Sequence, residues 1–142
     1  MTQSLAEESI DLLKQLISIP SFSREEEKTA DAIELFFTKH GLSPRRSRNN
    51  IWSVNKYYDV SKPTILLNSH HDTVKPNPGY TRDPFSADTE DGKLYGLGSN
   101  DAGGCLVSLI AVFRHFYNQE SLKYNICIAT TAEEEISGKN GI

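Results

Sequence analysis

Cysteine is scarce in this sequence, with two in 142 residues. Cys105 and Cys127 lie singly in separate apolar segments, so the fold does not depend on a disulfide framework or a zinc knuckle. We expect both to be buried free thiols, which are typical of a reducing compartment. The first residues, MTQSLAEESIDLL, are acidic where a secretory signal would be basic. Together these features predict a cytoplasmic protein.

Long apolar runs and a surplus of positive charge are also absent. No apolar stretch approaches the length of about 20 residues that a membrane-spanning helix needs. The net charge of −4 argues against a general binder of nucleic acid or of acidic membranes. The basic cluster at residues 44–50 has no aromatic side chains among its arginines, and we expect a solvated turn there. We therefore expect neither nucleic acid nor a membrane as a partner.

Three segments carry the signals of helices. The first starts at a capping box that opens with Ser4, and Pro20 ends it. The second repeats the capping pattern at Ser23, and Gly41 is its expected C-terminal cap. The third is amphipathic and begins at about Gly104.

Extended segments alternate with these helices. Residues 50–58 are a predicted strand, and Asp91-Gly92 between two short extended runs is a hairpin signal. Residues 64–70 and 124–132 are continuous apolar runs of the kind found in sheets covered on both faces. The alternation predicts an α/β fold, a mixed sheet with helices on both faces.

Polar clusters follow both apolar strands at their carboxyl ends, where the sites of such sheets gather. After residues 64–69 come His70, His71 and Asp72. His70 and Asp72 should point to the same side, with His71 pointing away. A carboxylate beside a histidine often fixes a metal-bound ring, although an H-x-D pattern alone more often marks a histidine satisfied in the core.

The stretch YGLGSNDAGG, residues 95–104, is the second candidate. Gly96 and Gly98 resemble the start of a dinucleotide-binding fingerprint, but Asp101 occupies the third glycine position and would repel a pyrophosphate. Asp101 also precedes a helix, so an N-cap role is the alternative to a role in the site.

Glu133, Glu134 and Glu135 follow the second apolar strand. Three consecutive glutamates usually mark a solvated face, but after a buried strand like charges favour a neutralising cation. Glu133 precedes the pair and should be nearly neutral when changed to alanine. Imidazole with carboxylates suits zinc, or cobalt or manganese, whereas calcium would be a poor match.

The order of these motifs resembles a known family. It is that of the co-catalytic zinc amidohydrolases and peptidases, which include acetylornithine deacetylase, succinyl-diaminopimelate desuccinylase and carboxypeptidase G. The resemblance runs from LLKQLISIPSFSREE through NSHHDTV and PFSADTEDGKLYGLGSNDAGG to TTAEEEISG. It implies a zinc-peptidase type of catalytic domain with two divalent metal ions, most readily zinc.

The resemblance also implies a role for each candidate residue. His70 would bind one metal, and Asp72 would orient its ring. Asp101 would bridge the two metals. Glu134 would be the general base, and Glu135 would bind the other metal.

After Asp101 the sequence both follows the family and departs from it. The resemblance implies that the peptide bond to Ala102 is cis. Many relatives then carry a lysine, where residues 102–104 are Ala-Gly-Gly here.

Acetylornithine deacetylase is the member that the sequence resembles most. This implies a small-molecule partner, an N-acyl amino acid substrate of the N-acetylornithine or N-succinylornithine type, whose amide bond is hydrolysed in arginine biosynthesis. The alternatives are a dipeptidase or carboxypeptidase on the same scaffold, and a non-catalytic binding module.

The resemblance also bears on domain organisation. Residues 1–142 would form the N-terminal portion of the metal-dependent catalytic domain. Family members supply a further carboxylate and a further histidine to the metals from later sequence, and a lid-like domain for substrate binding and homodimer formation. Metal ligation is therefore expected to be incomplete in residues 1–142 alone, which should be inactive by themselves.

Overall fold

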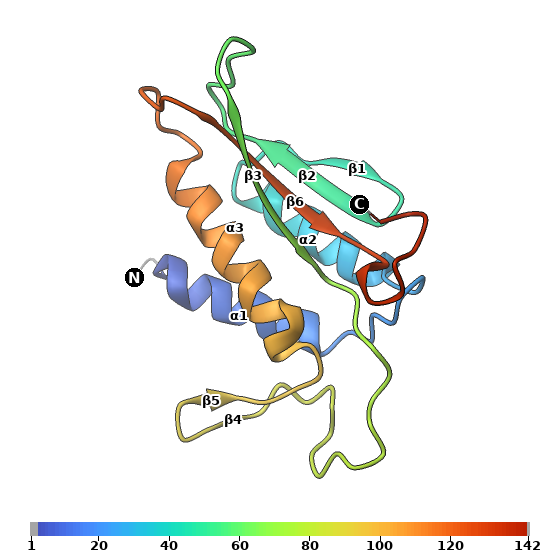
Figure 1. The fold of residues 1–142 in the computed structure, drawn as a ribbon. Helices are drawn as coiled ribbons and strands as arrows, with labels where there is room; N and C mark the ends of the chain where they lie inside the picture. The colour runs from blue at the N-terminus through green and yellow to red at the C-terminus, as the bar shows by residue number, and fades with distance from the viewer. Residues whose placement is uncertain (1–2, 142) are drawn as a thin grey trace.

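The structure is a computed structural model that describes residues 3–141. Figure 1 shows the arrangement of its helices and strands. The helices are α1 (Leu5–Ile17), α2 (Glu27–Lys39) and α3 (Gly104–Phe116). The strands are β1 (Arg45–Ser47), β2 (Asn50–Val54), β3 (Thr64–His70), β4 (Thr89–Glu90), β5 (Lys93–Leu94) and β6 (Asn125–Thr131). Two short helical turns, η1 (Ser99–Gly103) and η2 (Glu134–Ile136), precede α3 and follow β6.

The main sheet has the strand order β1-β2-β6-β3. β2 pairs with β1 and with β6 in antiparallel fashion, whereas β3 and β6 are parallel. The predicted fold class, a mixed sheet in an α/β fold, is therefore confirmed. β3 lies at the edge of the sheet, and its residues Ile65 and Leu66 are 46% and 54% exposed. The prediction that residues 64–70 are covered on both faces is wrong for the described residues, because most of β3 is exposed and no helix among residues 3–141 covers the face on which Leu66 lies.

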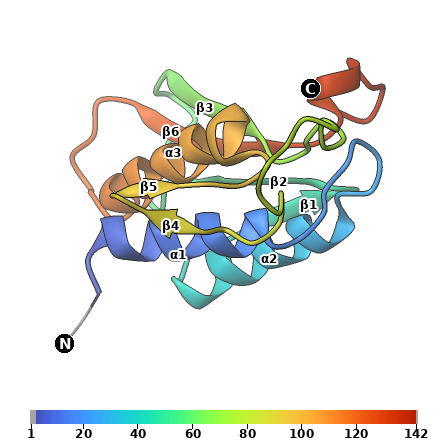
Figure 2. The same cartoon turned by 90° about the horizontal axis from the view of Figure 1, so that it is seen from below.

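Among residues 3–141 the helices pack on one face of the sheet, and not on both faces as expected from the sequence; Figure 2 shows this for α1 and α2. Ile51, Ile126 and Ile128 point to that face and join the helices in one buried core. The helical side chains of this core include Leu12, Leu16, Ile33, Phe37, Leu106, Ile110 and Phe113. On the opposite face, Trp52 and Leu66 line an open hollow to which no helix of the described range contributes.

The helix signals were mostly accurate. The Ser4–Glu7 capping box of α1 is present, and the left-handed Gly41 follows the end of α2. The second capping pattern was wrong. α2 begins at Glu27 with no side-chain cap, and the Ser23 hydroxyl donates to Asp72 instead.

The structure confirms the predicted hairpin and corrects the expectations for the cysteines and for the basic cluster. The predicted hairpin at Asp91-Gly92 is formed by β4 and β5. Both cysteines are free, but the expectation of burial was wrong: Cys105 is exposed on α3, and Cys127 is half-buried on the face without helices. The basic cluster is not simply a turn, because it contains β1, where Arg46 pairs with acidic side chains of α2. No helix in residues 3–141 is long and apolar enough to cross a membrane.

The glycine-rich stretch before α3 serves close packing in this structure. Gly98 has a φ of 76°, in the left-handed region that favours glycine. A side chain there would also approach the Thr73 methyl group to 2.7 Å. The backbone around Gly98 therefore lies directly against the segment that follows β3, which brings Asp101 close to His70.

Candidate metal centre

The parallel pairing of β3 and β6 brings two distant parts of the sequence together. The register places His70, the last residue of β3, opposite Thr131, the last residue of β6. The chain then turns at Glu133, whose φ is 57°, into the short helical turn that carries Glu134 and Glu135. The two polar clusters thus meet at the carboxyl edge of the sheet, as their positions after the strands predicted.

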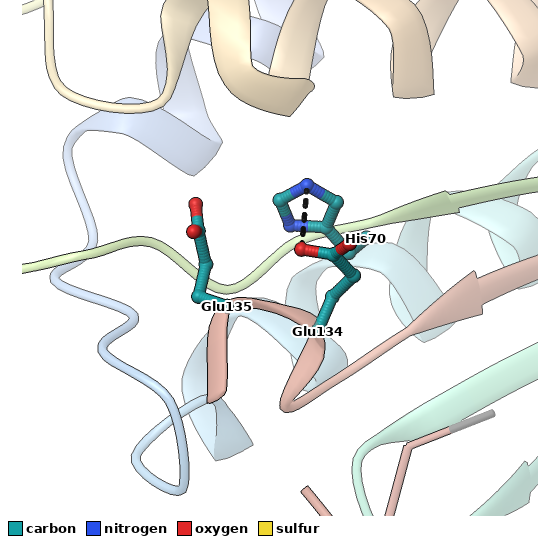
Figure 3. A group of neighbouring side chains, drawn as sticks. All are labelled: His70, Glu134 and Glu135. Carbon is teal, nitrogen blue, oxygen red and sulfur yellow. Dashed lines mark ion pairs between the residues drawn. The ribbon is translucent and has the colours of Figure 1, made fainter. Parts of the chain in front are cut away.

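Three side chains converge on one point at this edge. Ligand atoms of His70, Glu134 and Glu135 all lie within 4.8 Å of one another. Figure 3 shows the two glutamates rising from the loop after β6 toward the side on which the imidazole ring lies. His70 Nε2 is 3.7 Å from Glu134 Oε2 and 3.3 Å from Asp101 Oδ1.

Asp101 reaches this point from the segment before α3. It lies within η1, but its φ of −117° and ψ of 99° are not helical. Its side chain is 78% exposed and makes no capping hydrogen bond to the helix. The N-cap alternative is therefore not found, and the carboxylate faces His70. The peptide bond between Asp101 and Ala102 is cis, as the family resemblance implied.

Asp72 is fully buried and connects the two halves of the site. His70 Nδ1 lies 3.0 Å from the main-chain oxygen of Asp72 and 3.4 Å from its Oδ1. The backbone N–H groups of Glu134 and Glu135 donate to the same carboxylate at 3.1 and 3.2 Å. Asp72 therefore directs Nε2 of His70 toward the acidic side chains and also holds the turn that carries the glutamates.

The electrostatics of the site are dominated by carboxylates. The hydrogen bond to the Asp72 carboxylate outweighs the opposing effect of burial and raises the pKa of His70 to about 9. Burial opposes the charge of Asp72, but hydrogen bonds from His70, Ser23 and the two glutamate amides lower its pKa to about 2. Burial, and then the nearby Asp101 carboxylate, raise the pKa of Glu135.

This donor set fits a divalent metal ion. A cation among Asp101, Glu134 and Glu135 would relieve the repulsion between their charges. One imidazole with several carboxylates is a set of ligands that zinc, cobalt and manganese accept. His70, Asp101 and Glu135 are thus placed where they could hold such ions.

Two neighbouring residues have structural positions instead. His71 points away from the site, as expected, and its ring nitrogens lie 2.8 Å from the Asn49 oxygen and 2.9 Å from Thr29 Oγ1. Burial lowers the pKa of His71. Glu133 is only 5% exposed, and its carboxylate accepts a hydrogen bond from Asn140. This burial argues against the expectation that alanine at position 133 is nearly neutral.

Sequence reasoning missed two residues that support the site. Ser23 Oγ donates to Asp72 Oδ2 at 2.7 Å, and the buried Glu26 carboxylate accepts the N–H of Glu133. The spacing of Ser23 and Glu26 fits a capping box equally well, and that is the role which the sequence alone predicts for them. The available signal was that SFSREE belongs to the stretch that resembles the metal-dependent family.

A cavity of about 400 Å³ opens beside the acidic side chains. Asp101 and Glu135 line it together with Tyr80 and Tyr95. The remaining lining residues come from the loop after β3, from β5 and from the turn before α3. The candidate site therefore adjoins a space that a small molecule could enter.

Comparison with known proteins agrees with this geometry. Residues 66–142 match the sequence model of peptidase family M20/M25/M40. Acetylornithine deacetylase from Shigella sonnei (strain Ss046) is 34% identical over 140 residues, which cover 90% of this chain and 36% of that protein.

Solved structures give the same fold. The di-peptidase Dug1p from Saccharomyces cerevisiae matches with a TM-score of 0.72 and 23% identity, over 93% of this chain and 33% of that one. The YXEP protein of Bacillus subtilis, described as a dinuclear metal binding peptidase from the M20 family, matches with a TM-score of 0.70 and 17% identity. That match covers 96% of this chain and 37% of that one.

The chain spans about a third of the length of these relatives. The family match nevertheless includes the end of β3, the segment around Asp101 and the glutamate turn, where the candidate ligands lie. The resemblance seen in the motifs is confirmed, and the chain belongs to peptidase family M20/M25/M40.

Proposed function

We propose that residues 1–142 are the N-terminal portion of the catalytic domain of a metal-dependent amidohydrolase. The observation that carries this proposal is the meeting of His70 with Asp101, Glu134 and Glu135 at one edge of the sheet. The proposed reaction is hydrolysis of the amide bond of an N-acyl amino acid, of the N-acetylornithine or N-succinylornithine type. The identity of the curated relative from Shigella sonnei supports this substrate class.

Two divalent metal ions, most readily zinc, are the proposed cofactors. His70 would hold one of them, Glu135 the other, and Asp101 would bridge them. When bound, such a pair supplies an activated water and a polarised substrate carbonyl. A carboxylate and a histidine from other parts of the full-length enzyme would complete the ligand set, and a lid-like domain there would form the homodimer.

Within this chain, Glu134 is the proposed general base. Its side chain is 60% exposed and borders the site, so it can contact both water and substrate. Glu134 would take a proton from the attacking water and deliver it to the departing amine. Asp72 would keep the His70 ring in place. It would also hold Glu134, whose backbone N–H donates to the Asp72 carboxylate.

A dipeptidase is the second candidate function. The solved neighbour Dug1p is named a di-peptidase, and it has the same fold over nearly the whole of this chain. Both reactions cleave an amide bond at the same kind of centre. The substrates differ in the acyl group attached to the departing amine, which is acetyl or succinyl in one case and an aminoacyl group in the other. The cavity beside Asp101 and Glu135 would accommodate that group.

Metal removal from the full-length enzyme tests the proposal. Chelation should abolish hydrolysis of N-acetylornithine and N-succinylornithine, and added zinc or cobalt should restore it. Dipeptides assayed in parallel should be slower substrates. Faster turnover of dipeptides would favour the second candidate. A protein that binds no metal and hydrolyses neither kind of substrate would contradict both candidates and favour a binding module. Equal turnover with and without metal would contradict the metal-dependent mechanism.

A further inference from the structure

The turn that carries the candidate base and ligand is held by backbone hydrogen bonds to two buried carboxylates. The N–H groups of Glu134 and Glu135 donate to Asp72. The preceding N–H, that of Glu133, donates to Glu26 Oε1 at 3.1 Å. Three successive N–H groups therefore point at carboxylate oxygens from two other parts of the chain.

Glu26 is an unusual group to find in this position. It is 0% exposed, and no cation lies within ion-pair distance of it among residues 3–141. Its charge is instead met by three N–H donors. Besides Glu133, these are Arg24 N at 2.6 Å from Oε1 and Asn49 Nδ2 at 3.0 Å from Oε2. A buried carboxylate without a partner ion is costly unless such bonds satisfy it.

These bonds link Glu26 to three separate segments of the chain. Arg24 belongs to the loop before α2, and Asn49 to the turn before β2. The main-chain oxygen of Asn49 lies 2.8 Å from a ring nitrogen of His71, next to His70. Glu133, the third donor, has a φ of 57° and turns the chain out of β6. If the Glu26 carboxylate moved, the N–H of Glu133 would lose its acceptor. Glu133 is the residue that directs the chain into the turn carrying Glu134 and Glu135.

We propose that Glu26 is a positioning residue that sets the place of Glu134 and Glu135 relative to His70 through the N–H of Glu133. The inference goes beyond the proposed function, although its effect on turnover rests on that function. Glu26 touches neither substrate nor metal in this scheme. It acts through the location of its oxygen rather than through its charge.

Two substitutions in the full-length enzyme separate location from charge. Glu26→Asp keeps the charge but withdraws the acceptor by one methylene. Glu26→Gln keeps an oxygen at the same reach, and Asn49 can turn its amide to match the new NH₂ group. Supporting residues of this kind typically change metal affinity or activity by about 10–100-fold. We expect Glu26→Asp to lose about that much in kcat and in zinc affinity, with KM within about twofold, and Glu26→Gln to lose clearly less.

Asn125→Ala is the matched control. Asn125 is also 0% exposed, and its side chain bonds the backbone N–H and the main-chain oxygen of Asp59, but it lies at the opposite end of β6. It should lower thermal stability as much as Glu26→Asp does, with kcat and zinc affinity unchanged. Amide hydrogen exchange of the metal-free proteins should become faster in residues 132–138 for Glu26→Asp but not for the control.

The outcomes distinguish this inference from the proposed function. If Glu26→Asp keeps wild-type zinc affinity and exchange, or if Asn125→Ala loses zinc affinity equally, Glu26 has no positioning role. If Glu26→Gln is as impaired as Glu26→Asp, the inference is also overturned, because loss of the charge at an unchanged reach would then cost as much as a displaced oxygen. If the wild-type enzyme hydrolyses neither N-acyl amino acids nor dipeptides, the proposed function fails, and zinc affinity and exchange still decide the role of Glu26.

Discussion

Replacement of Glu134 by alanine in the full-length enzyme should lower the rate of amide hydrolysis by about 10²–10⁴-fold, the usual effect of removing a general base. Metal content should stay nearly intact, because Glu134 is proposed to contact the water rather than a metal. Glu135→Ala should lower metal content and activity together, since Glu135 is a proposed ligand. Metal analysis and hydrolysis rates on both variants provide the measurement.

The structure makes this division of roles a demanding test. Glu134 and Glu135 both place a carboxylate oxygen within 4.8 Å of a ring nitrogen of His70, so either could bind a metal there. If Glu134→Ala lost the metal while Glu135→Ala kept it, Glu134 would be the metal ligand and Glu135 the general base. Normal turnover in both variants would contradict the amidohydrolase proposal. Glu120→Ala, at an exposed position after α3, is a suitable control.

Metal affinity should rise steeply with pH. The hydrogen bond to Asp72 raises the pKa of His70 to about 9, so the metal-free ring is protonated at neutral pH. A metal can bind only the neutral ring, and binding must therefore release that proton. Below about pH 9 the affinity should increase roughly tenfold for each pH unit and should level off above that value. Zinc competition titrations between about pH 6.5 and 8, with proton release measured alongside, would detect this slope.

Asp72→Asn is the control for that slope. Without the carboxylate, the pKa of His70 should fall toward its ordinary value, so the pH dependence should move to lower pH and flatten between about pH 7 and 8. An affinity that is constant across that range in the wild-type enzyme would show that His70 is not protonated before the metal binds. Identical slopes in both proteins would show that Asp72 does not control the ring.

The position of the site could be predicted because it depends on features that are local in sequence. His70 and the glutamates each follow an apolar strand, and parallel strands end at the same edge of a sheet. The strand assignments alone therefore placed two clusters together. The capping box at Ser4 and the Asp91-Gly92 turn were predictable for the same reason, because each is decided by neighbouring residues.

The supporting contacts could not be predicted because they depend on which hydrogen-bond partners the fold supplies. Ser23 and Glu26 have the spacing of a capping box, but tertiary contacts offered Ser23 the Asp72 carboxylate and offered Glu26 the N–H of Glu133. The apolar composition of residues 64–70 likewise gave no sign that β3 would lie at the edge of this sheet. Composition reports what a strand can bury, whereas strand order depends on the whole chain.

Anomalous diffraction at the zinc absorption edge, from crystals of the full-length enzyme grown with zinc, tests the central claim most directly. The account predicts two zinc peaks at the carboxyl edge of the sheet. One should lie against Nε2 of His70 and the Asp101 carboxylate, and the other against Asp101 and Glu135. Zinc peaks elsewhere in an active enzyme, with none in contact with His70, would contradict it.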